Sequence, residues 1–372
     1  MIADVGGRPA DRGLARGPLR VALDAGPLLD PSTGVGRYTM ELRRHLELLG
    51  AIVRPYAVSL RGRGDGSVAR WRVPARAAQH AWRRFDRPSI ARLVGPVDVV
   101  HGTNFVLPAL GDAPGVVTVH DLSFQRDDTF PGGERLRDLV PWSLRRARRV
   151  VVPTNVIADE VVDHYRLRRE DVAVTHEGVS EVFFGARPLG STVLGGMGIP
   201  GPFAVAVGTI EPRKNLGRLL RAWRRAAVEL EGWTLVLAGP AGWGPGLPST
   251  PGVVPVGWVG DETLPGLLAA ADVFCYPSQY EGFGLPPLEA MAAGTAVLVG
   301  RYSAADEVLG DAALLVEPTD VDAIAGGLIA LATDEGLRRR FAMAGKARAA
   351  RYTWEATARG TLRAYREACE RS

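Results

Sequence analysis

Short apolar runs alternate along the chain with longer amphipathic runs. The apolar runs cover residues 20–25, 51–58, 97–102, 115–121 and 148–154 in the first half, and residues 203–209, 234–239, 253–259, 272–278 and 295–300 in the second. The clearest helical stripe consists of Tyr38, Leu42, His45, Leu46 and Leu49, and it stops at Gly50. Repeated pairs of a strand-length run and a helix-length run are typical of a parallel sheet with crossover helices.

Residues 184–202 interrupt this alternation, because they are rich in glycine and proline and show no periodicity. A chain of 372 residues also suits two domains better than one core. We therefore predict an α/β fold of two doubly wound, Rossmann-like domains that face each other across a cleft. The predicted parts are a disordered tail (1–18), an N-terminal domain (19–186), a linker (187–201), a C-terminal domain (202–352) and a C-terminal helix that packs back towards the N-terminal domain (353–372).

The composition is that of a globular protein, with 46% hydrophobic and 23% charged residues. The net charge of +4 suits phosphorylated ligands or an anionic membrane surface, and we expect no nucleic-acid partner. No run of about eighteen apolar residues predicts a membrane-spanning helix. The two cysteines, Cys275 and Cys369, are far apart, which favours a reducing cytoplasm over a disulfide framework. We thus expect a cytoplasmic protein.

Residues 61–92 are rich in arginine and tryptophan and allow two interpretations. In the first, Trp71 and Trp82 anchor the protein peripherally to the inner membrane, with the arginines on anionic head groups. In the second, both tryptophans pack on the N-terminal domain. The sequence leaves both interpretations open, together with the oligomeric state.

Two loops of the first half place candidate residues at predicted strand ends. The stretch DPSTGVGRY has Gly34 and Gly36 before a helix whose free N–H groups can meet an anion, and an ordinary tight turn is the alternative. The stretch VHDLSF places His120 and Asp121 at the end of a strand. A structural role for the histidine is the alternative there.

Two loops of the second half carry charge. In GTIEPRKNL, Arg213 and Lys214 precede a helix whose N-terminal dipole favours negative charge, so a diphosphate would suit the site. In QYEGFGLPPLEAMAAG, Glu281 lies in the loop and Glu289 lies near the start of a helix that two prolines begin. Carboxylates accept hydrogen bonds from hydroxyls, and the glycine amides between them donate to oxyanions. This combination suits a nucleotide sugar, whereas capping of the helix and a solvated loop charge are the alternatives.

These stretches, together with VGWVG and EVLGDAALLVEP, resemble the group 1 glycosyltransferases, glycosyltransferase family 4, of the GT-B fold. The resemblance runs from about Val21 to the C-terminal helices. It implies transfer of a sugar from an activated nucleotide with retention of the anomeric configuration. It also implies that neither a bound metal nor another cofactor is needed. The pair of glutamates is then a donor site and not the acid and nucleophile of a glycosidase.

The resemblance implies a role for each candidate residue. Glu289 would accept hydrogen bonds from the ribose and Glu281 would hold the donor sugar, while Arg213 and Lys214 would stabilise the leaving diphosphate. The amides of Phe283, Gly284 and Leu285 would face the sugar and phosphates, and Gly257 and Trp258 would read the base. Gly34 and Gly36 would approach the phosphates or the acceptor. His120 would touch the reacting sugar, and the acceptor site would be shaped by Asn104, Phe105 and Asp121. Many family members carry a further arginine where this chain has Thr209, and Arg37 is a candidate to replace it.

The phrases TGVGRY, HGTNF and EPRKN resemble the bacterial branch that transfers mannose, rhamnose or related sugars. We therefore expect GDP-mannose as donor, with dTDP-rhamnose and UDP-sugars as alternatives. The acceptor is a glycan, a lipid-linked intermediate or a small molecule. A non-catalytic protein that binds a nucleotide sugar or a glycan is the alternative to an enzyme. Asp320 and Asp322 fit a two-aspartate metal motif, but a helix cap explains them better.

Overall fold

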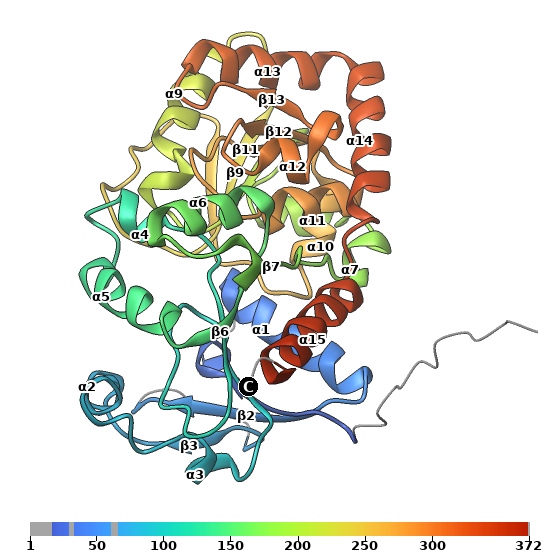
Figure 1. Ribbon diagram of the computed structural model, residues 1–372. Helices are drawn as coiled ribbons and strands as arrows, with labels where there is room; N and C mark the ends of the chain where they lie inside the picture. Colours follow the sequence, from blue (N-terminus) through green and yellow to red (C-terminus); the bar gives the residue numbers. More distant parts are fainter. Residues whose placement is uncertain (1–16, 30–32, 61–65, 371–372) are drawn as a thin grey trace, which may run out of the picture.

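The computed structural model describes residues 17–29, 33–60 and 66–370. Most of the predicted N-terminal tail lies outside these residues, as do residues 61–65 of the arginine-rich segment. The described chain forms two α/β halves stacked on each other, with the first half at the bottom of Figure 1 and the second at the top.

Within the described residues, the first half contains a seven-stranded sheet of order β3-β2-β1-β4-β5-β6-β7, in which all paired strands are parallel. Its strands are β1 (Arg20–Asp24), β2 (Ile52–Val58), β3 (Ala69–Trp71), β4 (Val99–Gly102), β5 (Gly115–Thr118), β6 (Ala147–Val152) and β7 (Val172–Val174). The five predicted runs of this half correspond to β1, β2, β4, β5 and β6. The strands β3 and β7 were not predicted, because three residues are too few for a recognisable apolar run.

The described part of the second half contains a parallel six-stranded sheet of order β10-β9-β8-β11-β12-β13. Its strands are β8 (Phe203–Val207), β9 (Thr234–Ala238), β10 (Val253–Gly257), β11 (Val273–Tyr276), β12 (Ala296–Gly300) and β13 (Leu314–Val316). The five predicted runs correspond to β8 to β12, and β13 is again a strand of three residues.

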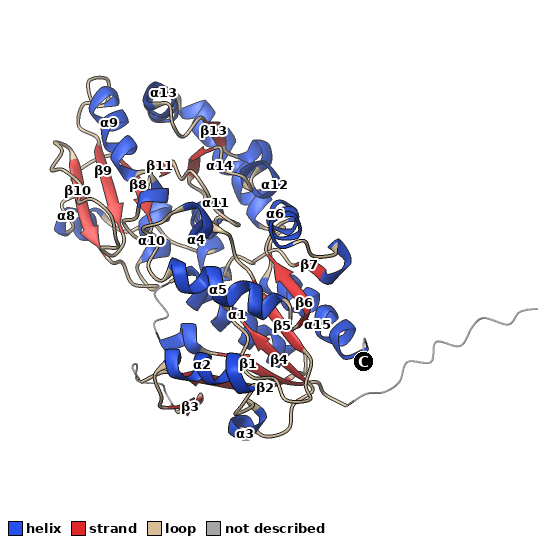
Figure 2. Ribbon diagram, turned by 60° about the vertical axis from the view of Figure 1, so that its left-hand side comes forward, coloured by secondary structure: helices blue, strands red, loops and turns tan. Residues whose placement is uncertain are grey.

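Helices connect the strands and cover both sheets (Figure 2). Their bounds are α1 (Gly34–Leu48), α2 (Ala75–Phe85), α3 (Ala91–Val94), α4 (Ser123–Arg126), α5 (Gly133–Leu144), α6 (Asn155–Tyr165), α7 (Glu181–Phe184), α8 (Ser191–Gly196), α9 (Leu216–Ala226), α10 (Leu264–Ala270), α11 (Leu285–Ala293), α12 (Ala305–Val308), α13 (Val321–Thr333), α14 (Glu335–Ala349) and α15 (Trp354–Glu370). The short helix α8 lies inside the segment predicted as a linker. Asp320 caps α13 by accepting hydrogen bonds from the amides of Asp322 and Ala323, which confirms the cap interpretation.

Both sheets have the doubly wound strand order, which confirms the predicted fold class. In each sheet the order reverses beside the first strand, between β1 and β4 and between β8 and β11. Ligands of such sheets bind outside the carboxyl ends of the strands at this reversal. The loops after these four strands are therefore the place where the fold positions a site.

The C-terminal helix α15 packs on the first half although it follows the second half in the chain. It contacts α1 and the strands β4 to β7, and Figure 1 shows it beside α1. The hydroxyl of Tyr365 lies 2.7 Å from His101 Nδ1, and the other ring nitrogen of His101 lies 2.8 Å from Thr118 Oγ1. Thr357 Oγ1 also donates to the carbonyl of His176 at 2.7 Å. These buried contacts tie the end of the chain to the first sheet.

His101 makes the stability of the fold sensitive to acid. Burial lowers the pKa of His101 to about 3. Between pH 6.5 and 3 this histidine is therefore protonated in the unfolded chain and neutral in the folded chain. The free energy of unfolding should therefore fall with decreasing pH between 6.5 and 3, by up to about 1.4 kcal/mol per pH unit. Urea unfolding at pH 7, 6 and 5 should show a slope that His101→Gln flattens. The exposed His80, changed to Gln, is the control that keeps the native slope, and equal slopes for all three proteins would contradict the prediction.

The tryptophans of the arginine-rich segment do not form a pair of exposed anchors. Trp82 on α2 is 6% exposed and its indole nitrogen donates to the carbonyl of Pro88 at 3.2 Å. Trp71 in β3 is half-buried against the same core. Both therefore pack on the first half, as in the second of the two interpretations. None of the helices within the described ranges is both long and apolar enough to cross a membrane.

Candidate functional site

A cavity of about 410 Å³ lies between the two sheets, outside the strand ends. The predicted site residues that line it are Gly34, Phe105, His120, Asp121, Arg213, Lys214, Trp258, Glu281, Leu285 and Glu289. Arg37 lines it as well. The fold thus brings together the charged residues that the sequence singled out in four separate loops.

Two cations and one acid form a buried cluster at the floor of this cavity. Arg213 and Lys214 lie in the short 3₁₀ turn Pro212–Lys214 that follows β8, and Glu281 lies in the loop after β11. Lys214 Nζ donates to Glu281 Oε1 at 2.7 Å, and Arg213 bonds the other oxygen of the same carboxylate. Arg213 Nε also lies 2.6 Å from Glu211 Oε1. The arginine therefore links two carboxylates while the lysine is held by one.

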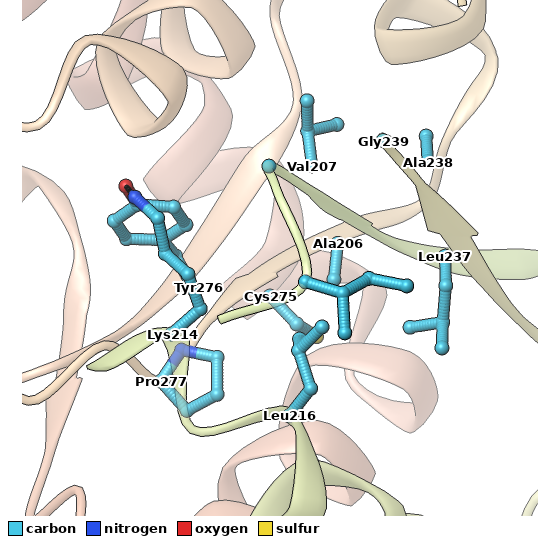
Figure 3. A pocket seen from close by; sticks show the side chains of 12 residues that line it. Ala206, Val207, Lys214, Leu216, Leu237, Ala238, Gly239, Cys275, Tyr276 and Pro277 are labelled. Atoms are coloured by element: carbon cyan, nitrogen blue, oxygen red, sulfur yellow. Dashed lines mark hydrogen bonds between the residues drawn. The ribbon is translucent and has the colours of Figure 1, made fainter. Parts of the chain in front are cut away.

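Hydroxyl groups complete the shell around Glu281. Tyr276 and Ser278 donate to its Oε1 at 2.9 and 2.6 Å. The Lys214 side chain runs along the Tyr276 ring, with Nζ 4.7 Å from the ring centroid and bonded to the phenol oxygen (Figure 3). The lysine is therefore held in one position by an acid and an aromatic ring.

The charges of this cluster determine its protonation. Burial raises the pKa of Glu281, but the positive charges of Arg213 and Lys214 outweigh burial and bring it to about 2. Burial, and then the charge of Arg213, lower the pKa of Lys214. Burial raises the pKa of Glu211. Glu281 is consequently a carboxylate at neutral pH and a poor base.

Glu289, the second candidate carboxylate, also lines the cavity. It is the fifth residue of α11, just past the first turn, and is 3% exposed. Burial raises its pKa, although Arg37 of α1 bonds its Oε1. The same arginine donates to Asp261 Oδ1 at 2.6 Å. Arg37 therefore joins the two halves, and a ligand hydroxyl on Glu289 would share or replace this arginine.

Both ring nitrogens of His120 are held by the protein. Nε2 donates to the carbonyl of Thr103 at 2.9 Å, and Nδ1 lies 3.2 Å from Glu177 Oε1. Burial opposes a charge on this ring, but the hydrogen bond and the charge of Glu177 outweigh burial and raise the pKa of His120. The histidine is therefore oriented through both ring nitrogens, and neither nitrogen is free to act as a base.

Five of the predicted residues lie beside the cavity and do not line it: Gly36, Asn104, Gly257, Phe283 and Gly284. The amide of Gly36 is taken by Thr33 Oγ1, which caps α1 at 3.0 Å. The ring of Phe283 packs on Tyr352 with centroids 5.6 Å apart. Gly284 has a φ of 97° and is the N-cap residue just before α11. Asn104 lines a neighbouring cavity of the first half. Gly257 has a φ of 69° and precedes Trp258, which is 57% exposed at the rim.

Sequence reasoning missed several residues that hold the site. Glu177, Thr103 and Asp261 bond His120 or Arg37, and the sequence analysis assigned none of the three a role, although Thr103 lies in HGTNF and Asp261 follows VGWVG. Glu211, in the stretch GTIEPRKNL, was likewise given no role, although it pairs with Arg213 inside the protein. The sequence feature that could have identified Glu211 is its position beside two cations at the end of a predicted strand.

Comparison with known proteins agrees with this geometry. Residues 200–348 match the family described as glycosyl transferases group 1, and residues 32–182 match glycosyltransferase family 4. The D-inositol 3-phosphate glycosyltransferase of Kribbella flavida is 30% identical over 97% of this chain and 97% of its own length. The chain belongs to the group 1 glycosyltransferases of family 4.

A further relative of this glycosyltransferase and a solved structure of the same fold extend the comparison. The O-antigen chain mannosyltransferase B of Escherichia coli is 28% identical over 94% of this chain and 100% of its own. The structure of Anabaena HepE, solved in complex with UDP and glucose, superposes with a TM-score of 0.68 at 16% identity, over 93% of this chain and 98% of that one. The first is similar in sequence along its whole length, and the second shares the GT-B fold.

Proposed function

We propose that this glycosyltransferase moves a sugar from a nucleotide diphosphate sugar to a hydroxyl of a glycan, lipid-linked or small-molecule acceptor, with retention of configuration. The observation that carries the proposal is the pairing of Arg213 and Lys214 with Glu281 in a cavity that Glu289 also lines. Cations suit a diphosphate and a buried carboxylate suits ribose hydroxyls. The HepE structure contains UDP and glucose, and that supports a nucleotide sugar here.

GDP-mannose is the proposed donor, with dTDP-rhamnose or a UDP-sugar as alternatives. The similarity to the mannosyltransferase of Escherichia coli over the whole chain supports mannose as the sugar. Its role in O-antigen chains supports polysaccharide biosynthesis as the setting. Trp258, exposed at the rim of the cavity, is the proposed neighbour of the base.

The mechanism that we propose uses no protein nucleophile. Glu281 is fully engaged with two cations and its pKa is about 2, so it is a weak nucleophile. We assign it to positioning the cations and the donor sugar. Negative charge grows on the leaving diphosphate, and Arg213 and Lys214 are preorganised to stabilise that charge without a metal. The diphosphate oxygen then takes the proton of the acceptor hydroxyl, which attacks from the same face, while the ring of His120 faces the reacting sugar.

The donor is identified by thermal stabilisation with GDP-mannose, dTDP-rhamnose, UDP-glucose and ADP-glucose. At a hundredfold excess over its Kd, the true donor should add about 2.7 kcal/mol and raise Tm by several degrees. Glu289→Ala should raise that Kd at least tenfold, because the carboxylate for the ribose is lost. Glu262→Ala removes an exposed acid outside the cavity and should match the native protein. Stabilisation by none of the four, or equal stabilisation of Glu289→Ala, would refute the donor site.

A further inference from the structure

Tyr280 immediately precedes Glu281 in the loop after β11, yet its side chain is buried in the other half of the molecule. It is 7% exposed and belongs to the same apolar cluster as Phe105 and Phe124 of the first half. It contacts α4 and α6, which Figure 1 shows on the side of the first half that faces the second. The loop of Glu281 is therefore inserted into the first half through this tyrosine.

The hydroxyl group of Tyr280 makes two hydrogen bonds to the first half. It donates to Glu160 Oε2 of α6 at 2.6 Å and accepts from the amide of Leu122 at 2.9 Å. Burial, and then the charge of Asp121, raise the pKa of Tyr280, so the phenol keeps the proton that it donates. Phenylalanine at this position would keep the buried ring and lose both hydrogen bonds.

The ring of Tyr280 is held as well as its hydroxyl. The guanidinium carbon of Arg126, on α4, lies 4.4 Å from the ring centroid, and Arg126 Nη2 donates to Glu160 Oε1 at 3.1 Å. Glu160 therefore holds the arginine with one oxygen and the phenol with the other. A cation over the ring and two hydrogen bonds at the hydroxyl together fix the position of the whole side chain.

The backbone of Tyr280 belongs to the charged cluster of the cavity. Its carbonyl accepts a hydrogen bond from Arg213 Nη1 at 3.2 Å. The next residue, Glu281, pairs with both Arg213 and Lys214. A shift of Tyr280 would therefore move the carboxylate that orients both cations.

Leu122 lies in the corresponding loop of the first half. The two residues before it, His120 and Asp121, line the cavity. Asp121 Oδ1 accepts a hydrogen bond from the amide of Ser123 at 2.9 Å, so this loop forms a tight turn around Leu122. The hydrogen bond between Leu122 and Tyr280 therefore joins the loop of His120 directly to the loop of Glu281.

We propose that Tyr280 is a positioning residue for sugar transfer, and that its hydroxyl fixes the loop of His120 and Asp121 against the loop of Glu281. Tyr280 does not line the cavity, so it acts through these loops and not on the donor itself. This inference rests on the proposed function, because the two loops must meet around one donor for transfer to occur.

The first test separates kcat from donor binding. Tyr280→Phe should lower kcat for release of nucleoside diphosphate about tenfold, because the buried Leu122 amide loses its partner. The Kd of the nucleoside diphosphate should stay within about twofold of the native value, because the contacts inside the second half remain. Tyr165→Phe removes a hydroxyl that Gln125 of α4 bonds at 3.1 Å within the first half, and this control should keep the native kcat. Native kcat in Tyr280→Phe, or a loss in Kd instead of kcat, overturns the proposal.

A second variant tests whether the hydroxyl acts through this contact. Glu160→Ala removes the group that accepts the phenol proton, and it should also lower kcat. The double variant of Tyr280→Phe and Glu160→Ala should lose no more kcat than the larger of the two single losses, because both changes break one link. Assays run well below the Tm of every variant compare folded proteins. Losses that multiply would show two independent effects and would overturn the link.

Hydrogen exchange of the nucleotide-free protein distinguishes this inference from the proposed function. In Tyr280→Phe the Leu122 amide, followed by mass spectrometry of overlapping peptides, should exchange about tenfold faster than in the native protein. Unchanged exchange overturns the link between the loops, and faster exchange with native kcat overturns the positioning role. Faster exchange in a chain whose native form binds no nucleotide overturns the proposed function and leaves the link between the two halves in place.

Discussion

Changing Lys214 to methionine is expected to lower the rate of sugar transfer by about 10²–10³-fold, the typical effect of removing one donor that stabilises developing charge. The side chain is 11% exposed and is fixed by Glu281 and by the Tyr276 ring. It therefore stabilises the leaving diphosphate without reorganising. Methionine keeps the length of the side chain and removes only the charge. The measurement is release of nucleoside diphosphate from the donor, in kcat and in KM.

Loss of folding stability must be separated from loss of rate in this variant. Removing one partner of a buried ion pair costs about 3 kcal/mol, so Lys214→Met should also lower Tm. The double variant Lys214→Met with Glu281→Gln removes both charges, and it should recover Tm while the rate stays low. The only other lysine in the sequence, Lys346, is exposed on α14, and Lys346→Met is the control. A double variant that recovered the rate together with Tm would show that the lysine is structural.

The strands and the loops of this fold were predictable to different degrees. Runs of five or more apolar residues, such as β8 and β12, stand out because both faces of a parallel sheet are buried. The three-residue strands β3, β7 and β13 do not, since their pairing depends on a neighbouring strand and not on their own pattern. The cleft was predictable from the two series of alternating strand-length and helix-length runs, because doubly wound sheets bind ligands outside the carboxyl ends of their strands.

The site was predictable as a set of residue types and not as a set of contacts. Charge next to a strand end identified Arg213, Lys214, Glu281 and Glu289. The bond between Arg37 and Glu289 joins residues 252 positions apart, so it depends on how the two halves meet. For Gly36 the sequence predicted a contact that the structure does not leave open. Its amide was expected to bind an anion, and it donates instead to Thr33 Oγ1, the cap of α1. A local capping bond competes with any ligand for the same donor, and the sequence motif does not reveal which one occupies it.

Gly282→Ala is expected to lower kcat/KM for transfer by about 10²-fold. An added Cβ would lie 1.8 Å from the carbonyl oxygen of His120, in a contact between the two halves of the molecule. Real Cβ atoms essentially never approach a heavy atom within 3.0 Å, so the loop of Glu281 and the loop of His120 must separate by more than an ångström. A misplacement of about 1 Å at reacting groups can cost a factor of about 10². Initial rates of nucleoside diphosphate release over a range of donor concentrations measure the effect.

Variants at the contact between these two loops should form a graded series in activity. Thr154 Oγ1 donates to the Gly282 carbonyl at 3.0 Å, so Thr154→Val loosens the same contact without a steric conflict and should cost about tenfold in kcat/KM. Gly217→Ala, in the exposed part of α9 with nothing within 4 Å of the added atom, is the matched glycine control and should keep native activity. Circular dichroism and Tm show whether each variant folds. Native activity in a folded Gly282→Ala protein would mean that the two loops need not meet for transfer, and the ring of His120 would then lose its place in the proposed mechanism.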